Sequence, residues 1–177
     1  MNNFHFFICE RIDKSLQQAI FSLRHQVFTL EQGIPQQMDQ DGKDLSAIHL
    51  VVTQNKKVIA TARLEKLCHK SVLLSRIAVK KDFRKKGLAR EIVKKMIDYG
   101  KEKGFLQINV NAHHHLIPFY KELQFKIAGE PISLLQYSLQ PMHQMLIKVY
   151  ENPPAPLLQD QPDIPIKGNG TQKNIDC

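Results

Sequence analysis

The sequence predicts an α/β fold in which a mixed sheet carries helices on its faces. Apolar segments with strand character alternate along the chain with segments whose apolar residues recur at helical spacing. The strongest helix is predicted from Gly87 to Gly104, because one stripe of its surface is apolar and the opposite side is charged. Two strands, residues 48–53 and 57–64, are separated by the short turn Gln54-Asn55, which favours an antiparallel hairpin.

The N-terminal part is predicted to contain one strand, one helix and a loop. Residues 3–12 have strand character, and residues 15–28 form an amphipathic helix with Asp13 or Ser15 as its N-cap. Residues 33–44 contain a proline, two glycines and three aspartates, so we expect a polar loop before the hairpin.

The second half of the sequence alternates strands with helices. Strands are predicted over residues 72–79, 106–110, 125–128 and 142–150, and a short helix over residues 114–123. The long helix follows the first of these strands. This order of elements predicts one sheet layer that is covered by helices.

A chain of 177 residues is expected to form one domain, which buries about 70% of the surface that its unfolded form exposes. We expect this domain to span residues 1–150. Residues 151–177 are rich in proline and lack periodicity, so this tail is expected to be disordered or loosely docked. Three cysteines without CxxC spacing, and no apolar leader or membrane-length apolar run, predict a reduced, cytoplasmic setting without a membrane partner.

The net charge of +8 limits the kinds of partner. It suits nucleic acid, an anionic membrane surface or a phosphate-rich cofactor. The basic residues concentrate around one loop, at Lys80, Lys81, Arg84, Lys85, Lys86 and Arg90. No basic stripe is interleaved with aromatic residues, so a phosphate-rich cofactor is favoured and no nucleic acid is expected.

This loop joins the strand Leu74 to Val79 to the long helix and has the properties of a phosphate-binding turn. Gly87 has no side chain, so the backbone can approach a ligand closely. The first N–H groups of a helix have no partner within it, and the positive end of the helix dipole lies behind them. The segment lacks the Gly-Lys-Ser/Thr of a P-loop and the triple glycine of a dinucleotide-binding fold.

The pattern Arg84-x-x-Gly87-x-Ala89 after a strand resembles the acyl-CoA pyrophosphate loop of the GNAT superfamily of N-acetyltransferases. Further along the chain, Phe119 to Phe125 is similar to the Phe-Tyr-x-x-x-Gly-Phe helix end of that family. Four upstream segments are similar to its ElaA-like branch: Arg24 to Gln32, Asp41-Gly42-x-Asp44, His49-Leu50 and Ala60 to Leu64. The resemblance covers about residues 3–150.

The resemblance implies a mixed, mostly antiparallel sheet with helices on both faces. It also implies that two central parallel strands, one ending at Val79 and one beginning at Leu106, diverge in a V that holds the pantetheine arm. The implied activity is the transfer of acetyl from acetyl-CoA to a primary amine by direct attack in a ternary complex. The acceptor amine is not identified by the sequence, and the chain is expected to be a monomer or a homodimer.

Several residues receive roles from this resemblance. Main-chain groups of Ile77, Ala78 and Val79 are expected to bind the pantetheine, and the N–H of Ala78 to hold the thioester oxygen. Tyr120 has the position of the acid that protonates the CoA sulfur. His115 matches an Ala-His pair of the branch and either faces the cofactor or is solvated. The diphosphate is expected on the loop residues Arg84, Lys85, Lys86, Gly87, Leu88, Ala89 and Arg90.

The sequence offers several candidates for the general base. Glu31 is the first candidate, because it belongs to a family-like segment, and His49 is the second. Arg24 and Arg63 either hold an acidic part of the acceptor or pair structurally with Glu31 or Asp44. The three aspartates of the polar loop hint at a cationic acceptor.

Two local features bear on the site. Gln124 stands where the family has glycine, and a left-handed backbone is strained for a non-glycine residue, so a differently shaped helix end is expected. His113, His114 and His115 are consecutive and point in different directions, so they do not converge on one ion and no metal is expected.

Two alternatives to an N-acetyltransferase are considered. A non-catalytic CoA-binding or interaction module would keep the fold without a working acid and base. The segment Arg24-x-x-Val27-Phe28 also resembles acyl-homoserine-lactone synthases, which use the same fold with longer acyl donors.

Overall fold

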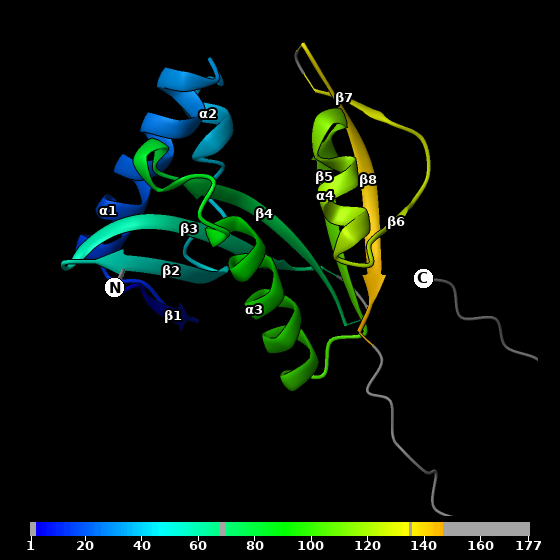
Figure 1. Cartoon of the computed structure of the whole chain (residues 1–177), viewed down its shortest axis with the longest axis horizontal. Coiled ribbons are helices and arrows are strands. Elements are labelled where there is room, and N and C mark those ends of the chain that lie inside the picture. The colour runs from blue at the N-terminus through cyan, green and yellow to red at the C-terminus, as the bar shows by residue number, and fades with distance from the viewer. Residues whose placement is uncertain (1–2, 68–69, 135, 147–177) are drawn as a thin grey trace, which may run out of the picture.

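The computed structural model describes residues 3–67, 70–134 and 136–146, which form a mixed sheet with helices on both faces (Figure 1). Its elements are β1 (His5–Cys9), α1 (Lys14–Arg24), the π-helix η1 (His25–Glu31), α2 (Gln36–Asp39), β2 (Ile48–Gln54), β3 (Lys57–Lys66), β4 (Ser71–Val79), η2 (Lys81–Phe83), α3 (Leu88–Glu102), β5 (Gln107–His113), η3 (His114–Leu116), α4 (Ile117–Glu122), β6 (Lys126–Ile127), β7 (Ile132–Leu134) and β8 (Tyr137–Met145). No helix in these ranges is long and apolar enough to cross a membrane.

The strands lie in the order β1-β2-β3-β4-β5-β8-β6, and β7 also pairs with β8. Among the described strands, β4 and β5 are parallel and the other neighbouring pairs are antiparallel. The predicted mixed α/β class with a mostly antiparallel sheet is therefore confirmed.

The two parallel strands pair over three residues and then separate. The last of these pairs joins Leu73 of β4 to Asn109 of β5. There the side-chain Nδ2 of Asn109 donates to Ser71 Oγ at 2.7 Å and to the main-chain oxygen of Val72 at 3.0 Å. Beyond this point β4 and β5 diverge, as Figure 1 shows. The predicted V between two central parallel strands is thus present.

Helices cover the two faces of the sheet over different strands. On one face α3 and α4 cover the sheet (Figure 1). Ile92 and Met96 of α3 belong to the main core together with inward-facing side chains of β2 to β5. On the other face α1 and η1 pack against β3 and β4, where Leu23 and Val27 contact Ala78. The amphipathic pattern of the long helix is thus satisfied by burial of its apolar stripe.

The element boundaries differ from the prediction in three places. The first helix ends at Arg24 and continues as the π-helix η1, and the predicted polar loop contains the short helix α2. The strand expected at residue 142 already begins at Tyr137, where it forms a hairpin with the unpredicted β7. Residues 147–150 of that expected strand and the expected tail, residues 151–177, lie outside the described residues.

The end of α4 has the shape that a glycine would permit, although glycine is absent. Gln124 has a left-handed φ of 67°. The N–H of Phe125 donates to the oxygen of Tyr120 at 3.0 Å, and the N–H of Gln124 donates to the oxygen of Lys121 at 2.9 Å. The expectation of a differently shaped helix end is therefore wrong, because the main-chain hydrogen bonds and the buried ring of Phe125 hold Gln124 in a strained conformation.

We expect Gln124→Gly to raise the free energy of unfolding by about 1 kcal/mol, because glycine adopts a left-handed φ without the steric cost of a Cβ. Gln124→Ala is the matched control, since it keeps the Cβ and should change stability by less than about 0.5 kcal/mol. Urea unfolding followed by circular dichroism measures both. A glycine variant that is no more stable than the alanine variant would show that the turn is unstrained.

Candidate active site

The N-terminus of α3 presents main-chain N–H groups that have no acceptor within the described residues. Gly87 is the N-cap with a φ of 78°, and no side chain caps the helix. Lys85 also has a left-handed φ, of 60°. The N–H groups of residues 85–90 donate no main-chain hydrogen bond in the described chain, and a Cβ built on Gly87 would have nothing within 4 Å. The described residues therefore leave the N–H groups of this turn free, and anion binding there stays a prediction.

The side chain of Arg84 is held by the protein itself. Its Nε donates to the main-chain oxygen of Val79 at 2.9 Å, and its Nη2 lies 2.7 Å from Oε2 of Glu31. Glu31 is at the C-terminal end of η1, so this ion pair joins the helix that covers β4 to the loop that follows β4. The candidate base Glu31 is therefore already engaged.

The side chains of the other basic residues of the loop differ in whether the protein itself supplies a hydrogen-bond or ion-pair partner. Lys86 donates to the main-chain oxygen of Asp82 at 2.9 Å, and Arg90 pairs with Glu122 on α4. Lys80, Lys81 and Lys85 are exposed and have no carboxylate partner in the described chain. The loop thus carries three exposed lysines that no carboxylate of the described chain pairs.

β4 contains a bulge that changes which main-chain groups face the V. Thr61 pairs with Ala78 and Arg63 with Ser75, so β4 has one more residue than β3 between these pairs. Arg76 lies in this interval with a φ of 54°. The irregularity comes immediately before Ile77, the first residue expected to bind the pantetheine.

The hydrogen-bond alternation of the sheet shows which of these residues point into the V. The N–H of Lys80 donates to the oxygen of Ile59 at 2.9 Å, so the main-chain groups of Lys80 point toward β3. In an antiparallel strand the main-chain groups of alternate residues point toward the same neighbouring strand. Those of Ala78 therefore also point toward β3, whereas those of Val79 point into the V. The oxygen of Val79, which accepts from Arg84, agrees with this direction. The main chain of Ala78 is thus directed toward Thr61 rather than toward a ligand.

Tyr120 lies in the main core on α4 and is only 7% exposed. Its ring contacts Phe119 and Phe125 edge-on, at centroid distances of 5.1 and 5.4 Å. Burial raises the pKa of its phenol to about 12. The phenol therefore keeps its proton at neutral pH, which is the form that a proton donor needs.

An aromatic group lies where β5 ends. The rings of His113 and Tyr137 meet edge-on at a centroid distance of 5.0 Å, and His115 stacks on His113 at 5.8 Å. The hydroxyl of Tyr137 donates to the main-chain oxygen of Gln32 at 2.6 Å. Because Gln32 follows η1, which packs on β4, this bond joins the two arms of the V. No three His, Cys, Asp or Glu side chains of the described residues are grouped so that they could hold a metal ion.

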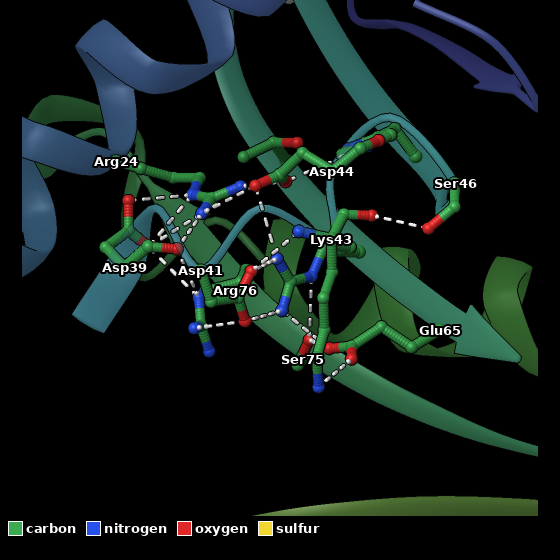
Figure 2. A network of polar contacts seen from close by, with 12 residues as sticks. Arg24, Asp39, Asp41, Lys43, Asp44, Ser46, Glu65, Ser75 and Arg76 are labelled. Atoms are coloured by element: carbon green, nitrogen blue, oxygen red, sulfur yellow. Dashed lines mark hydrogen bonds and ion pairs between the residues drawn. The ribbon is translucent and has the colours of Figure 1, made fainter. Parts of the chain in front are cut away.

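A network of charged side chains joins α1 and α2 to β3 and β4, as Figure 2 shows. Arg24 is fully buried and donates from Nε to Asp39 at 3.0 Å and from Nη1 to Asp44. Arg63 is 1% exposed and donates to Asp41 at 2.7 Å and to Asp44 at 3.2 Å. Asp44 thus accepts from both buried arginines.

The network continues through Arg76 and Glu65 toward the V. Arg76 donates to the main-chain oxygen of Met38 at 2.7 Å and to Asp41 at 3.1 Å. Glu65 accepts from Arg63 at 2.6 Å and from Ser75 at 3.0 Å, and it lies 3.0 Å from the ammonium of Lys43. Four cations and four carboxylates balance each other in this network, namely Arg24, Arg63, Arg76, Lys43, Asp39, Asp41, Asp44 and Glu65.

Burial and pairing act in opposite directions on these groups. Burial alone would raise the pKa of Asp41 and Glu65, but bonds from Arg63 and Lys43 outweigh it and lower both pKa values. Burial alone would lower the pKa of Arg63, but the surrounding carboxylates raise it. Asp41, Glu65 and Arg63 therefore stay ionised at neutral pH.

These contacts decide several sequence-based alternatives. Arg24 and Arg63 pair with Asp44, as one alternative held, but not with Glu31. Both arginines are buried and balanced, so neither is free to hold an acidic acceptor, and the hint of a cationic acceptor from the aspartates loses its basis. His49 is fully buried, its Nε2 lies 2.9 Å from the main-chain oxygen of Asp44, and burial lowers its pKa. An acceptor amine cannot reach it.

Sequence reasoning missed Arg76 and Glu65. A signal for Arg76 was available, because a charged residue interrupts the mostly apolar strand Leu73 to Val79. Charged residues in such strands are paired when they are buried. The partner could not be read from the sequence, since Asp41 is 35 residues away.

The splayed sheet, the bulge in β4 and the uncapped N-terminus of α3 define the acyl-CoA N-acyltransferase class of fold. A family model described as "Acetyltransferase (GNAT) domain" matches residues 10–146. The chain therefore belongs to the GNAT acetyltransferase family.

Relatives and solved structures agree with this membership. UPF0039 protein sll0451 of Synechocystis sp. is 32% identical over 124 residues, which are 68% of this chain and 80% of that protein. The uncharacterized N-acetyltransferase YjcF of Bacillus subtilis is 27% identical over 118 residues, which are 67% of this chain and 83% of that protein.

Two solved structures have the same fold. Escherichia coli ElaA has a TM-score of 0.73 and 23% identity, and the match covers 80% of this chain and 99% of that chain. The CoA-dependent acyl-homoserine lactone synthase BjaI, solved with SAM and isopentyl-CoA, has a TM-score of 0.67 and 16% identity. The match covers 82% of this chain and 85% of that chain. The resemblance to the ElaA-like branch is thus supported at the level of the fold.

We expect Arg24→Met to lower the free energy of unfolding by about 3–5 kcal/mol, because Asp39 and Asp44 would be left buried without their cation. Arg90→Met is the matched control, since it removes an exposed ion pair with Glu122 and should cost less than about 1 kcal/mol. Urea unfolding measures both. Equal small losses would contradict a structural role of the buried network.

Proposed function

We propose that the protein transfers an acetyl group from acetyl-CoA to a primary amine, by direct attack of the amine in a ternary complex. The observation that carries this proposal is the set of free N–H groups at the start of α3, next to the diverging edge of β4, in a chain of the GNAT family. A thioester carrier with a phosphate-rich end fits both features. The acetyl donor and the cytoplasmic setting stay predictions.

The diphosphate of CoA binds the N–H groups of Lys85, Lys86, Gly87, Leu88, Ala89 and Arg90. The N–H groups supply hydrogen bonds, and the positive end of the α3 dipole favours the negative charge. The exposed ammonium groups of Lys80, Lys81 and Lys85 add attraction for the remaining phosphate. Arg84 acts differently from the other loop residues, because Val79 and Glu31 hold its side chain against β4.

The pantetheine arm adds to the open edge of β4 in the manner of a further strand. Val79 and Ile77 offer main-chain groups to it, since they alternate with Ala78, which faces β3. We therefore assign the thioester oxygen to an N–H next to the bulge, at Ile77 or Val79, and not to that of Ala78 as the sequence led us to expect. A donor aimed at the developing oxyanion lowers the barrier of acyl transfer.

Tyr120 supplies the proton for the departing thiolate. Its phenol stays protonated at neutral pH because burial raises its pKa to about 12. The protonated CoA thiol leaves as the amide forms, and the orientation of amine and thioester supplies much of the rate. Cys9 is not needed as a nucleophile, and burial, with the charge of Asp13, raises its pKa above the ordinary value.

Glu31 and His115 keep less specific roles in this proposal. The carboxylate of Glu31 is paired with Arg84, so it orients the phosphate loop and is not free to accept a proton. His115 is exposed beside His113 and stays a predicted contact of the cofactor. The alternative of an acyl-homoserine-lactone synthase has the shared fold of BjaI as its support.

We expect wild-type protein to release CoA thiol from acetyl-CoA with at least one amine of a panel of spermidine, glucosamine, glycinamide and a lysine-containing peptide. Tyr120→Phe should lower kcat by about 10²–10⁴-fold with an unchanged affinity for acetyl-CoA, because the ring stays packed and only the acid is lost. Thiol detection and calorimetric titration measure the two quantities. Tight acetyl-CoA binding without turnover, unaltered by Tyr120→Phe, would favour the non-catalytic CoA-binding module instead.

Gly87→Asp should weaken acetyl-CoA binding by about 10- to 100-fold, because it adds a carboxylate where the diphosphate binds. Gly87→Asn is the matched control, since asparagine has the same shape, tolerates a left-handed φ and carries no charge. Calorimetric titration with acetyl-CoA compares the two. Equal affinities of both variants would rule out phosphate binding at this turn.

A further inference from the structure

β5 has an apolar face and a polar face. Ile108, Val110 and Ala112 are buried in the main core with α3 and α4. Because side chains alternate along a strand, Asn111 and His113 point to the opposite face, on which α1 packs. Asn111 is exposed and His113 is half-buried, so a ligand can reach this part of the face.

His113 lies at the same height along the sheet as Ala78. The last paired residues of the two parallel strands are Leu73 on β4 and Asn109 on β5. His113 is four residues beyond Asn109, whereas Ala78 is five residues beyond Leu73, and the bulge at Arg76 takes up one of those five. At about 3.3 Å per residue, the two strands therefore extend over the same length from their last paired residues to Ala78 and His113. His113 is level with the reactive end of the thioester in the proposed function.

The ring of His113 is fixed by contacts from two elements. Tyr137 of β8 meets it edge-on, and His115 of η3 stacks on it; these are the titratable groups packed against it. The bond of Tyr137 to Gln32 brings the end of η1 to the same opening. Glu31, which precedes Gln32 in the chain, is already paired with Arg84.

The acid and the polar face of β5 lie on opposite sides of the sheet. Tyr120 belongs to the core beneath α4, together with Ala112. His113 points away from that core. An amine that approaches the carbonyl from the α1 face therefore meets His113, while the sulfur departs toward the side that carries the acid.

We propose that His113 is the general base of the reaction and that it contacts the acceptor amine, an inference that rests on the proposed acetyl transfer. The amine nitrogen forms a bond to the thioester carbon, and the carbon–sulfur bond breaks. The proton lost by the nitrogen passes to the imidazole of His113, and Tyr120 gives a proton to the thiolate. Exchange with water returns both side chains to their starting forms. The products are the amide and CoA thiol.

The protonation state of His113 agrees with this role. Burial, and to a lesser extent the electrostatic effect of the neighbouring His115, lowers the pKa of His113 below the ordinary value of histidine. Its imidazole is therefore neutral at pH 7 and has a free nitrogen to accept a proton. The activity is expected to fall on acidification as His113 becomes protonated.

The test measures thiol release across pH for wild type and His113→Gln, with the amine of the panel above that reacts fastest. His113→Gln should lower kcat by about 10²–10⁴-fold, remove the acid limb of the pH profile and leave acetyl-CoA affinity within about threefold. Added imidazole should restore part of the rate. His114→Gln is the matched control, because His114 is the exposed neighbour and has no assigned role. His115→Gln should move the acid limb to higher pH, since it removes the electrostatic effect of His115 that lowers the pKa of His113.

The outcomes separate this inference from the proposed function. An absence of thiol release by wild type with every amine contradicts the proposed function itself. Turnover by His113→Gln that matches wild type and keeps the acid limb overturns only the role of His113. Loss of the acid limb in Glu31→Gln, with His113→Gln unaffected, would return the role of base to Glu31. Calorimetric titration with acetyl-CoA and thermal unfolding show that each variant is folded, and His113→Asn provides a second substitution.

Discussion

The separation of β4 from β5 after three residue pairs is the constraint on which the rest of the structure depends. It leaves the edge of β4 from Leu74 to Val79 without a neighbouring strand in the described chain. An unpaired edge in the middle of a sheet is costly unless water or a ligand satisfies its main-chain groups. Asn109 ends the parallel pairing with side-chain bonds to β4, and the bond between Tyr137 and Gln32 joins the arms at the other end. The gap is thus defined at both ends by hydrogen bonds.

The buried ionic network holds the helices of one arm in register with this gap. Replacing the network by apolar side chains would avoid the cost of desolvating its buried charges, so stability alone does not account for it. Its bonds are directional, however, and they attach α2 and the loop after it to the bulge in β4 through Arg76. The bulge decides which main-chain groups face the ligand. The network therefore stabilises a particular backbone geometry beside the site more than it stabilises the fold as a whole.

Much of the fold follows from patterns in the sequence, and less of the site does. The apolar stripe of α3 and the glycine in the turn before it indicate both the helix and the anion-binding character of its N-terminus. The neutralisation of the loop aspartates by buried arginines was not predictable in the same way. Asp39 and Asp44 pair with Arg24, which lies 15 and 20 residues earlier in the chain. The hairpin of β7 and β8 was also missed, since β7 has only three residues, all exposed, and its alternation is too short to support a strand prediction.

The sequence by itself determined the class of fold, the long helix and the glycine turn before it, because these depend on local periodicity and on the properties of single residues such as Gly87. Only the tertiary structure decided the direction of the Ala78 main chain, the pairing of Glu31 with Arg84 and the position of His113. One extra residue in a strand reverses the direction of each main-chain group after it, and neither the bulge nor the neighbour across the V is encoded by residues nearby in the chain. These three features arise where segments that are distant in sequence meet.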